Sequence, residues 1–540
     1  TRAVTLEMNG PLVWLSSLTF LGDATRVEPD RLVAHVVNQS QTAWRPIACR
    51  LWLPQSPGEP LVFRGREERT DFLPFPLNTP IEPGARGGLV LTTGRLPLGF
   101  AAVEIRLGDD AGARSLTLWG SLRVKREVFD ISGGWVSNEV GGRSTLTHVP
   151  FLKTLARMHV NTAHIGEVPG YTDSEELYAR YPLKLFNKLE PTARFESESM
   201  LPRVHGVEFL GEPQYGGGRP VPPQEVWNAL RPYQTTKLAT TLTHSEERVW
   251  RYYAGLSDYP HFDAYRVNAP AADAWGRYDR WKDGPVLWGA PLETIGDLTR
   301  SLRELNRPRP IASWSQGAHD GWGRYWGRTR TSPTPEELRS QADHALARRI
   351  TSLYWFNLSL KSLLKFRDLI EPITRVNREI RLLDDLLLEG DAYEDRRLER
   401  GGEPDWDLAS VVGPRGGWFF ALDLDYSPNR QSRVFEFKPA RAAEFRFRLP
   451  SWLVQPAEVA RVDADGVHDV DHRAEGGTLI IQDIRSVVGI YLAAREPGMR
   501  DRLAREHQQL LSREKSLDFD PASNVQDFAT LNLIMPSAPP

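Results

Sequence analysis

A carboxylate between a glycine and a proline stands out in the stretch VEFLGEPQYGG, residues 207–217. The apolar, strand-like run ends at Gly211, which lets the backbone approach closely, and Pro213 stops a strand because it cannot donate a hydrogen bond. This pattern would present the Glu212 carboxyl at a strand end, where it could exchange a proton with a substrate. The alternative is that Glu212 caps a turn or pairs with an arginine such as Arg219.

The part of the chain that must position Glu212 alternates short apolar runs with longer amphipathic ones, from Val128 to about Leu388. Strands are expected at FDISGGWV, HVNTAHIGEV, PLKLFNKL, HGVEFLGE, KLATTLTH, FDAYRVNA, RPIASWSQ and ITSLYWFN, and amphipathic helices lie between several of them. About eight such units in roughly 260 residues predict a (β/α)8 barrel. A helix should begin at Pro335, because Thr334 can cap it and the following acids suit its first turn.

The rest of the chain has the texture of β-sandwiches. Residues 1–126 and 391–495 consist of short alternating apolar runs separated by turn residues, which predicts a sandwich on either side of a barrel at 127–390. Residues 496–540 should form a basic amphipathic helix and an extended tail. The predicted fold class is therefore a central α/β barrel with all-β domains at both ends of the sequence.

The barrel gives Glu212 a functional interpretation. Residues that perform chemistry in such barrels lie at the carboxyl ends of the strands, where the loops converge. Glu212 ends the fourth predicted strand, so a role in a reaction is favoured over a turn cap.

Two stretches resemble a known family. Gly211-Glu212-Pro213 resembles the Asn-Glu-Pro ending of the fourth strand in retaining glycoside hydrolases of the large barrel clan that includes many cellulases and β-galactosidases. The segment from Arg309 to Leu358 is similar to the seventh-to-eighth-strand region of sandwich-flanked, glycosidase-like barrels. The resemblance implies a carbohydrate substrate and a general acid/base role for Glu212.

The sequence departs from that clan at the end of the seventh strand. The clan places a nucleophilic Glu there, whereas this chain has Gln316 in WSQG, and an amide cannot act as a carboxylate nucleophile. Asp320 could instead be the base of an inverting reaction, or Gln316 could hold a sugar while the sugar itself assists. Four further acids remain open alternatives: Glu167, Glu198, Glu246 and Asp273.

Aromatic and polar residues near the predicted strand ends are candidate sugar contacts, because an indole offers an apolar face and one N–H donor. Trp135, Trp314 and Trp355 lie near the ends of strands one, seven and eight, and Trp322 lies in the loop after strand seven. The alternative is that these tryptophans pack helices against the barrel and do not contact a ligand. The remaining candidates are polar: His164, Glu167, Tyr215, His244, Asn268 and Gln316.

Composition excludes several classes of function. A formal net charge of -3 gives no broad basic field for nucleic acid. Cys49 is the only cysteine, so no intrachain disulfide forms, and the sequence shows no catalytic metal motif or cofactor fingerprint. No apolar run reaches the ~18 residues of a spanning helix. The start at Thr1 is compatible with a cleaved export signal and equally with a trimmed chain, so export is an open expectation and the oligomeric state is not predicted.

The leading hypothesis from the sequence is a glycoside hydrolase with Glu212 as its general acid and Asp320 as a candidate second carboxylate. The rival, motivated by Gln316, is a barrel that binds carbohydrate or supports an assembly without catalysis.

Overall fold

The structure of the 540-residue chain is a computed structural model. It describes residues 12–22, 29–54, 61–63, 72–75, 80–125, 128–136, 139–140, 143–164, 168–189, 194–209, 211–214, 220–267, 280–281, 286, 288–318 and 332–517. The chain divides into two compact units. The first comprises residues 1–127 with 307–309 and 450–452, and the second comprises the rest.

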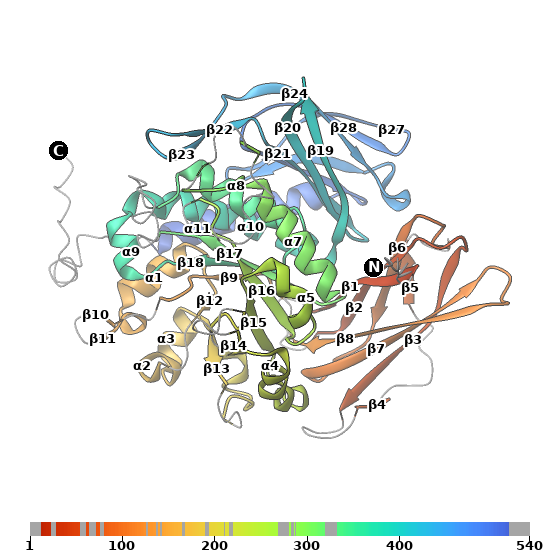
Figure 1. Ribbon diagram of the computed structural model, residues 1–540, viewed down its shortest axis with the longest axis horizontal. Coiled ribbons are helices and arrows are strands. Elements are labelled where there is room, and N and C mark those ends of the chain that lie inside the picture. The colour runs from red at the N-terminus through yellow and green to blue at the C-terminus, as the bar shows by residue number, and fades with distance from the viewer. Residues whose placement is uncertain are drawn as a thin grey trace, which may run out of the picture. The chain divides into compact units, whose positions relative to one another are not determined.

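The first unit is a β-sandwich, as the sequence predicted. Two four-stranded antiparallel sheets have the orders β1-β2-β6-β5 and β4-β3-β7-β8. Alternate residues of both sheets, such as Leu18, Leu89 and Val103, form one buried core. The strands are β1 (Val13–Leu21), β2 (Arg31–Asn38), β3 (Trp44–Pro54), β4 (Leu61–Phe63), β5 (Phe72–Phe75), β6 (Arg86–Thr92), β7 (Gly99–Asp109) and β8 (Ser115–Val124). They are drawn from red to orange in Figure 1.

The second unit contains the predicted barrel. Its closed sheet has the order β12-β13-β14-β15-β16-β17-β18-β9, and all neighbouring strands are parallel. The strands are β9 (Asp130–Ser132), β12 (Thr162–Ala163), β13 (Lys184–Lys188), β14 (Val204–Phe209), β15 (Thr240–His244), β16 (Tyr259–Asp263), β17 (Ala312–Gln316) and β18 (Ser352–Phe356). The expectation of a central (β/α)8 barrel is confirmed.

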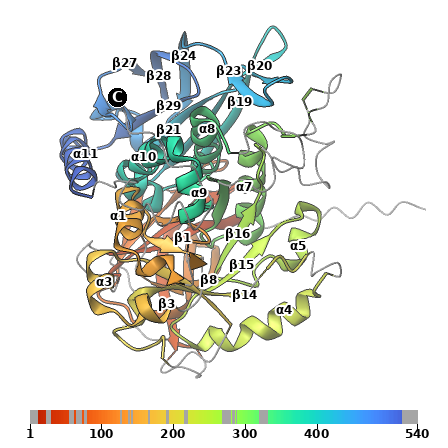
Figure 2. The ribbon, with the colours of Figure 1, turned by 90° about the vertical axis from the view of Figure 1, so that its left-hand side faces the viewer.

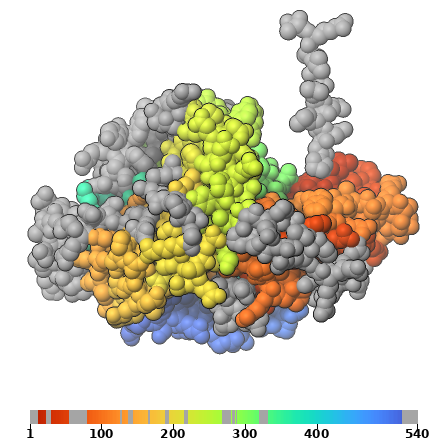
Figure 3. Space-filling view, turned by 90° about the horizontal axis from the view of Figure 1, so that it is seen from below, coloured from red at the N-terminus to blue at the C-terminus, as the bar shows by residue number. Residues whose placement is uncertain are grey.

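Helices surround this barrel (Figure 2). They are α1 (Val149–Arg157), α2 (Pro169–Thr172), α3 (Glu175–Arg180), α4 (Pro223–Leu230), α5 (Trp250–Tyr253), α7 (Glu293–Asn306), α8 (Pro335–Leu346), α9 (Leu360–Lys365) and α10 (Ile370–Glu389). A small hairpin, β10 (Glu139–Val140) and β11 (Arg143–Ser144), precedes α1. In the space-filling view, residues around 150–250 form one continuous gold to yellow-green surface (Figure 3).

The sequence predicts the start of helix α8 correctly but places the sixth barrel strand too late. Helix α8 begins at Pro335 with a complete capping box between Thr334 and Glu337, as predicted. The sixth strand was expected at FDAYRVNA, residues 262–269, but β16 already ends at Asp263. Pro260 lies inside β16, and a proline in a central strand is normally evidence against a strand.

The C-terminal part of the second unit is a second sandwich. A six-stranded sheet, β19-β20-β21-β29-β25-β26, faces a three-stranded sheet, β24-β28-β27. Rings pack between them, with Trp406 4.8 Å from Phe445 and Phe419 5.4 Å from Phe447. The strands are β19 (Asp391–Arg400), β20 (Glu403–Val412), β21 (Gly416–Asp423), β24 (Arg441–Arg448), β25 (Glu458–Asp463), β26 (Gly466–His468), β27 (Asp471–Glu475), β28 (Thr478–Arg485) and β29 (Val488–Ala494). A separate hairpin, β22 (Tyr426–Asn429) and β23 (Val434–Phe437), and helix α11 (Met499–Ser516) complete it.

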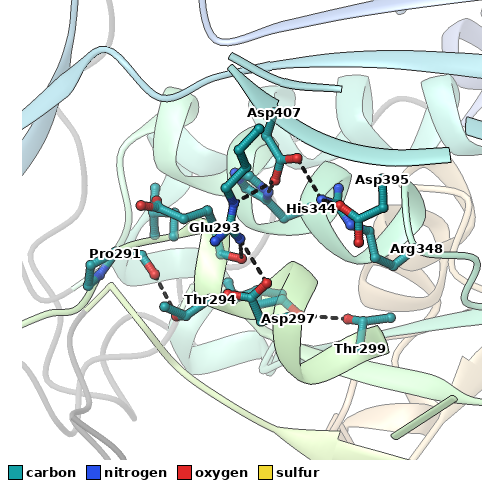
Figure 4. Close-up of polar contacts among 12 residues, drawn as sticks. Pro291, Glu293, Thr294, Asp297, Thr299, His344, Arg348, Asp395 and Asp407 are labelled. Carbon is teal, nitrogen blue, oxygen red and sulfur yellow. Dashed lines mark hydrogen bonds and ion pairs between the residues drawn. The ribbon is translucent and has the colours of Figure 1, made fainter. Parts of the chain in front are cut away.

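Buried ion pairs join the barrel helices to this sandwich (Figure 4). Arg348, at the end of α8, reaches Asp407 at 2.6 Å and Asp395 at 2.7 Å. Asp407 is fully buried, and removal of one partner from such a pair leaves an uncompensated charge. Buried charged groups therefore connect the barrel helices to the C-terminal sandwich.

Candidate active site

The site is built from side chains that point into the barrel at the carboxyl ends of its strands. Asp263 of β16 stands opposite Trp314 of β17, which in turn stands opposite Tyr354 of β18. In β14 the pairing with β13 skips His205, so this extra residue bulges. A bulge re-aims the side chains around it, and both His205 and Glu208 lie among interior residues.

Two carboxyl groups meet at this end of the barrel. Asp263, the last residue of β16, hydrogen bonds through its side chain to Glu212, which follows β14. Burial, together with the hydrogen bond and the negative charge of Glu212, raises the pKa of Asp263 well above its ordinary value. A buried carboxyl beside a second carboxylate is favoured in its protonated form, so the contact with Glu212 helps Asp263 to keep its proton.

A third carboxyl, Glu208, stays ionised deeper in the barrel. Its side chain is 3% exposed, with Oε2 2.6 Å from Nε2 of His164 and Oε1 3.4 Å from Nε2 of His261. Burial alone would raise its pKa, but the interactions with the two imidazoles, those with His164 being the larger, outweigh it and lower the pKa to about 2. The hydroxyl of Thr243 donates a further, long bond of 3.4 Å to Oε1.

The protonation pattern of His261 follows from its neighbours. Burial lowers the pKa of His261 more strongly than Glu208 raises it, so the imidazole is neutral near neutral pH. Nε1–H of Trp314 donates to Nδ1 of His261 at 2.7 Å. The proton of His261 therefore sits on Nε2 and points at Glu208.

Aromatic rings enclose His164. Its ring centroid lies 4.3 Å from that of Trp135, 4.7 Å from Phe186 and 5.0 Å from Trp314. Trp135 is only half-buried, whereas the other two rings are almost fully buried. Such flat apolar faces around polar groups suit the C–H faces and hydroxyl edges of a sugar.

A second polar layer lies among the interior residues. Asp130 of β9 pairs with Lys184 of β13 and lies 3.1 Å from Nδ1 of His205. Nε2 of His205 in turn lies 2.9 Å from the hydroxyl of Tyr354. These contacts link strands β9, β13, β14 and β18 through the barrel interior.

The structure brings together some of the predicted site residues. Trp135, His164 and Trp314 form one cluster, and Glu212 contacts Asp263. Gln316 shares the face of Trp314 on β17, and its main chain exchanges two hydrogen bonds with the side chain of Gln341 on α8.

Two predicted residues lie elsewhere. Trp355 follows the interior residue Tyr354, so strand alternation turns it outwards, where its Nε1–H donates to Asn377 of α10 at 2.9 Å. His244 likewise turns away from the interior and lies 6.1 Å from the ring of Trp250. Burial, followed by the charge of His261, lowers its pKa to about 3. Neither residue is placed with the site.

Five predicted residues lie outside the described part of the chain, and their roles remain predictions. These are Glu167, Tyr215, Asn268, Asp320 and Trp322.

Sequence reasoning missed Asp263, Glu208 and His261 as site residues. The available signal was the period of two along YPHFD, which places His261 and Asp263 on one face of the strand. Glu208 is a single acid within an apolar run, and such an acid is normally expected to point to the surface.

The β22–β23 hairpin anchors the loop that follows Asp263. Phe435 and Tyr426 of the hairpin form one buried cluster with Val267 and Trp288 at the two ends of that loop. The hydroxyl of Tyr426 accepts a bond of 2.6 Å from the main-chain N–H of Leu292. The hairpin of the C-terminal part therefore packs against both described ends of the segment that follows Asp263.

The same hairpin also contacts the start of α8, where the loop after β17 ends. The main-chain N–H of Phe435 donates to Oε1 of Glu337 at 2.8 Å, while Oε2 of Glu337 accepts from the main chain of Thr334. The β22–β23 hairpin therefore contacts described ends of the loops after β16 and after β17.

Within the described residues, no group of three or more His, Cys, Asp or Glu side chains is arranged to hold a metal ion. No helix in the described ranges has the length and apolar character needed to cross a membrane.

Comparison with known proteins finds similarity in three-dimensional structure only. No family model matches the sequence, and no curated protein matches it significantly. Similar solved structures include a putative alpha-galactosidase from Bacteroides fragilis NCTC 9343, with a TM-score of 0.36 and 11% identity over 85% of this chain and 99% of that chain. A family 51 alpha-L-arabinofuranosidase from Bifidobacterium longum has a TM-score of 0.36 and 10% identity, covering 68% of this chain and 96% of its own.

A beta-glucuronidase from Ruminococcus gnavus, solved with D-glucuronic acid, has a TM-score of 0.30 and 12% identity, covering 64% of this chain and 61% of its own. These neighbours carry names of glycosidases, the class that the sequence resemblance indicated. Similarity at this level carries no argument about the reaction of this chain, which has to be argued from its own side chains.

Proposed function

We propose that the protein is a glycoside hydrolase whose acid is the carboxyl pair formed by Glu212 and Asp263. The observation that carries this proposal is the hydrogen bond between these two carboxyls at the carboxyl ends of barrel strands. Cleavage of a glycosidic bond needs a proton for the departing oxygen, and a buried acid beside a like charge keeps its proton near neutral pH.

The pair acts as one acid. Its single proton passes to the glycosidic oxygen while the bond from that oxygen to the anomeric carbon breaks, and the pair is left with an additional negative charge. Repulsion between the two carboxylates then favours recovery of a proton from solvent. Glu212 and Asp263 are both half-buried, so either carboxyl can face the substrate.

The aromatic cluster around His164 supports a carbohydrate substrate. Trp135 and Trp314 offer apolar faces, and His164 offers a polar edge between them. Indole faces beside hydrogen-bonding groups match the alternation of C–H and O–H groups on a sugar ring.

The two paired carboxyls cannot also supply the second catalytic group. Retaining glycosidases hold their carboxyls ~5–5.5 Å apart and inverting ones ~6.5–9.5 Å apart, with the sugar between them, whereas Glu212 and Asp263 are in hydrogen-bonding contact. Gln316 cannot act as a nucleophile either. Asp320 remains a candidate for this role.

The test is hydrolysis of a broad panel of oligosaccharides and aryl glycosides by the full chain and by Glu212→Gln and Asp263→Asn. Each variant should lose a factor of about 10² or more in kcat. Glu225→Gln, on the exposed face of α4, is the matched isosteric control and should leave the rate unchanged. Hydrolysis that persists in both site variants would contradict the assignment.

A second candidate is a barrel that binds carbohydrate without cleaving it. The amide of Gln316 at the end of β17 favours it, because an amide binds hydroxyls but performs no displacement. Binding of oligosaccharides without any cleavage by the wild-type chain would select this alternative.

A further inference from the structure

The proposed reaction still needs a group that activates water on the far side of the sugar from the acid. We propose that His164, held by Glu208, is this base, so that the reaction inverts the anomeric centre. This inference rests on the proposed function and names the partner of its acid.

The contact between His164 and Glu208 fixes which ring nitrogen carries the proton. Nε2 of His164 lies 2.6 Å from Oε2 of Glu208, and the carboxylate can only accept a hydrogen bond because it is ionised. In the neutral form of the imidazole this contact places the proton on Nε2, and Nδ1 then carries a lone pair. A general base needs this lone pair.

Nδ1 of His164 has no hydrogen-bond partner among the described residues. The side chain is 4% exposed, and Nδ1 itself is buried. A buried nitrogen without a partner carries an energetic penalty that a bound water or a substrate hydroxyl would remove. The rings of Trp135 and Trp314 pack against His164, and the face of an indole offers no hydrogen-bonding atom to Nδ1.

The other histidines of the barrel strands do not combine these properties. His261 accepts from Trp314 at Nδ1 and faces Glu208 with Nε2. His205 contacts Asp130 with Nδ1 and Tyr354 with Nε2. His244 packs beside Trp250, away from the carboxylates. Among these four histidines, only His164 has one nitrogen held by an ionised carboxylate and the other without a hydrogen-bond partner in the described part of the chain. His159 has the same arrangement with Glu514, but there the carboxylate belongs to α11 and not to a barrel strand.

The position of His164 suits a base that works opposite the carboxyl pair. It follows β12 directly, at the same end of the barrel as Asp263. Asp263 and His261 are alternate residues of β16, about 7 Å apart. In the closed eight-stranded order, β12 and β16 are four strands apart, so His164 and Asp263 come from opposite sides of the barrel. In the proposed reaction the sugar carbon and the water lie between these two sides.

The chemical step balances without another reactant. Water gives a proton to Nδ1 of His164 while its oxygen forms a bond to the anomeric carbon. The bond from that carbon to the departing oxygen breaks, and that oxygen takes the proton of the Glu212–Asp263 pair. The imidazolium is stabilised by Glu208 and releases its proton to solvent, and the carboxyl pair takes a proton up. One water is consumed for each bond cleaved.

The experiment compares His164→Ala with wild type on a substrate whose hydrolysis depends on Glu212. We expect kcat to fall by about 10²–10⁴-fold with little change in KM, and added imidazole to restore part of the rate. Anomeric proton signals recorded at early times should show the inverted product. A rate within threefold of wild type, or a product of retained configuration, would overturn the proposal.

A matched variant separates catalysis from packing. His205→Asn removes another buried imidazole that also contacts a carboxylate, and we expect any loss of its activity to be insensitive to imidazole. Rescue of this variant to the same extent as His164→Ala would count against a specific role for His164.

A second measurement does not depend on turnover. Nitrogen-15 spectra of the histidine-labelled full chain should show His164 with its proton on Nε2 and none on Nδ1, and Glu208→Gln should change this signal. A proton found on Nδ1 of the neutral ring would overturn the assignment of the base even if no substrate were known. Absence of Glu212-dependent hydrolysis, by contrast, would contradict the proposed function itself.

Discussion

The side chain of Asp263 hydrogen bonds to that of Glu212, although the two residues belong to barrel strands that are separated by β15. Two acids from non-adjacent strands therefore meet at the carboxyl end of the barrel. Packing alone gives no reason for such contact, because like charges in a buried position lower the stability of the fold. Function is the better explanation of the pair.

Asp263→Asn should stabilise the fold while it removes activity. The pKa of Asp263 is raised in the folded chain, so its unfavourable contribution is absent below the ordinary value near 3.8 and grows as the pH rises above it. The amide cannot ionise and can still donate a hydrogen bond to Glu212. We expect a Tm increase of about 1–3 °C at pH 7 that vanishes near pH 4, measured by thermal unfolding. A variant that unfolds earlier than wild type at pH 7 would contradict this account.

Glu208→Gln should have the opposite effect on stability. The pKa of Glu208 is lowered to about 2, so its stabilising contribution is complete above the unfolded value near 4.5 and is lost as the pH falls through about 2. We expect a loss on the order of 3 kcal/mol at pH 7 that shrinks below pH 4, measured by urea unfolding. An equal loss at pH 3 and pH 7 would show that the charge of Glu208 is not its cause.

Trp355→Phe should weaken the fold and spare substrate binding. Its indole donates to Asn377 and packs under α10, so the variant loses a buried hydrogen bond, at about 1–2 kcal/mol. Trp314→Phe, which removes the donor to Nδ1 of His261, should raise KM or lower kcat. Comparison of the two variants in unfolding and in kinetics checks this division, and a raised KM in Trp355→Phe alone would reverse it.

Phe435→Ala should loosen the loop after β16. Its ring stacks 5.7 Å from Trp281 and lies 4.9 Å from Trp288, so truncation opens a cavity against that loop. Hydrogen exchange should accelerate at residues 264–267 and 288–292, and kcat/KM should fall several-fold. Glu436→Ala, the exposed neighbour on the same strand, is the control. Unchanged exchange in Phe435→Ala would show that the hairpin does not hold the loop.

The architecture could be predicted from the sequence because its signals are local. The period of two, the amphipathic helices and the capping box at Thr334 each occupy one short segment, and the barrel and both sandwiches follow from their order. The sixth strand was placed too late because Pro260 conceals its start.

The site could be predicted only in part because its contacts are not local. Glu212 was identifiable from Gly211 and Pro213 beside it, but its partner Asp263 is brought to it by closure of the barrel. Glu208 becomes recognisable only when His164 and His261 meet it across the interior. In the sequence, Trp314 and Trp355 both lie near the end of a predicted strand. Only the alternation of side chains in the structure shows that Trp314 faces the barrel interior and Trp355 faces outwards.

The hairpin β22–β23 gives the C-terminal sandwich a role in the evolution and engineering of this chain. The hairpin contacts the ends of the loops after β16 and β17. A barrel cut from the chain at Glu389 would therefore lack these contacts. Exchange of the C-terminal sandwich between related chains would therefore alter the loops that border the substrate. Barrel and sandwich should be inherited, and redesigned, as one piece.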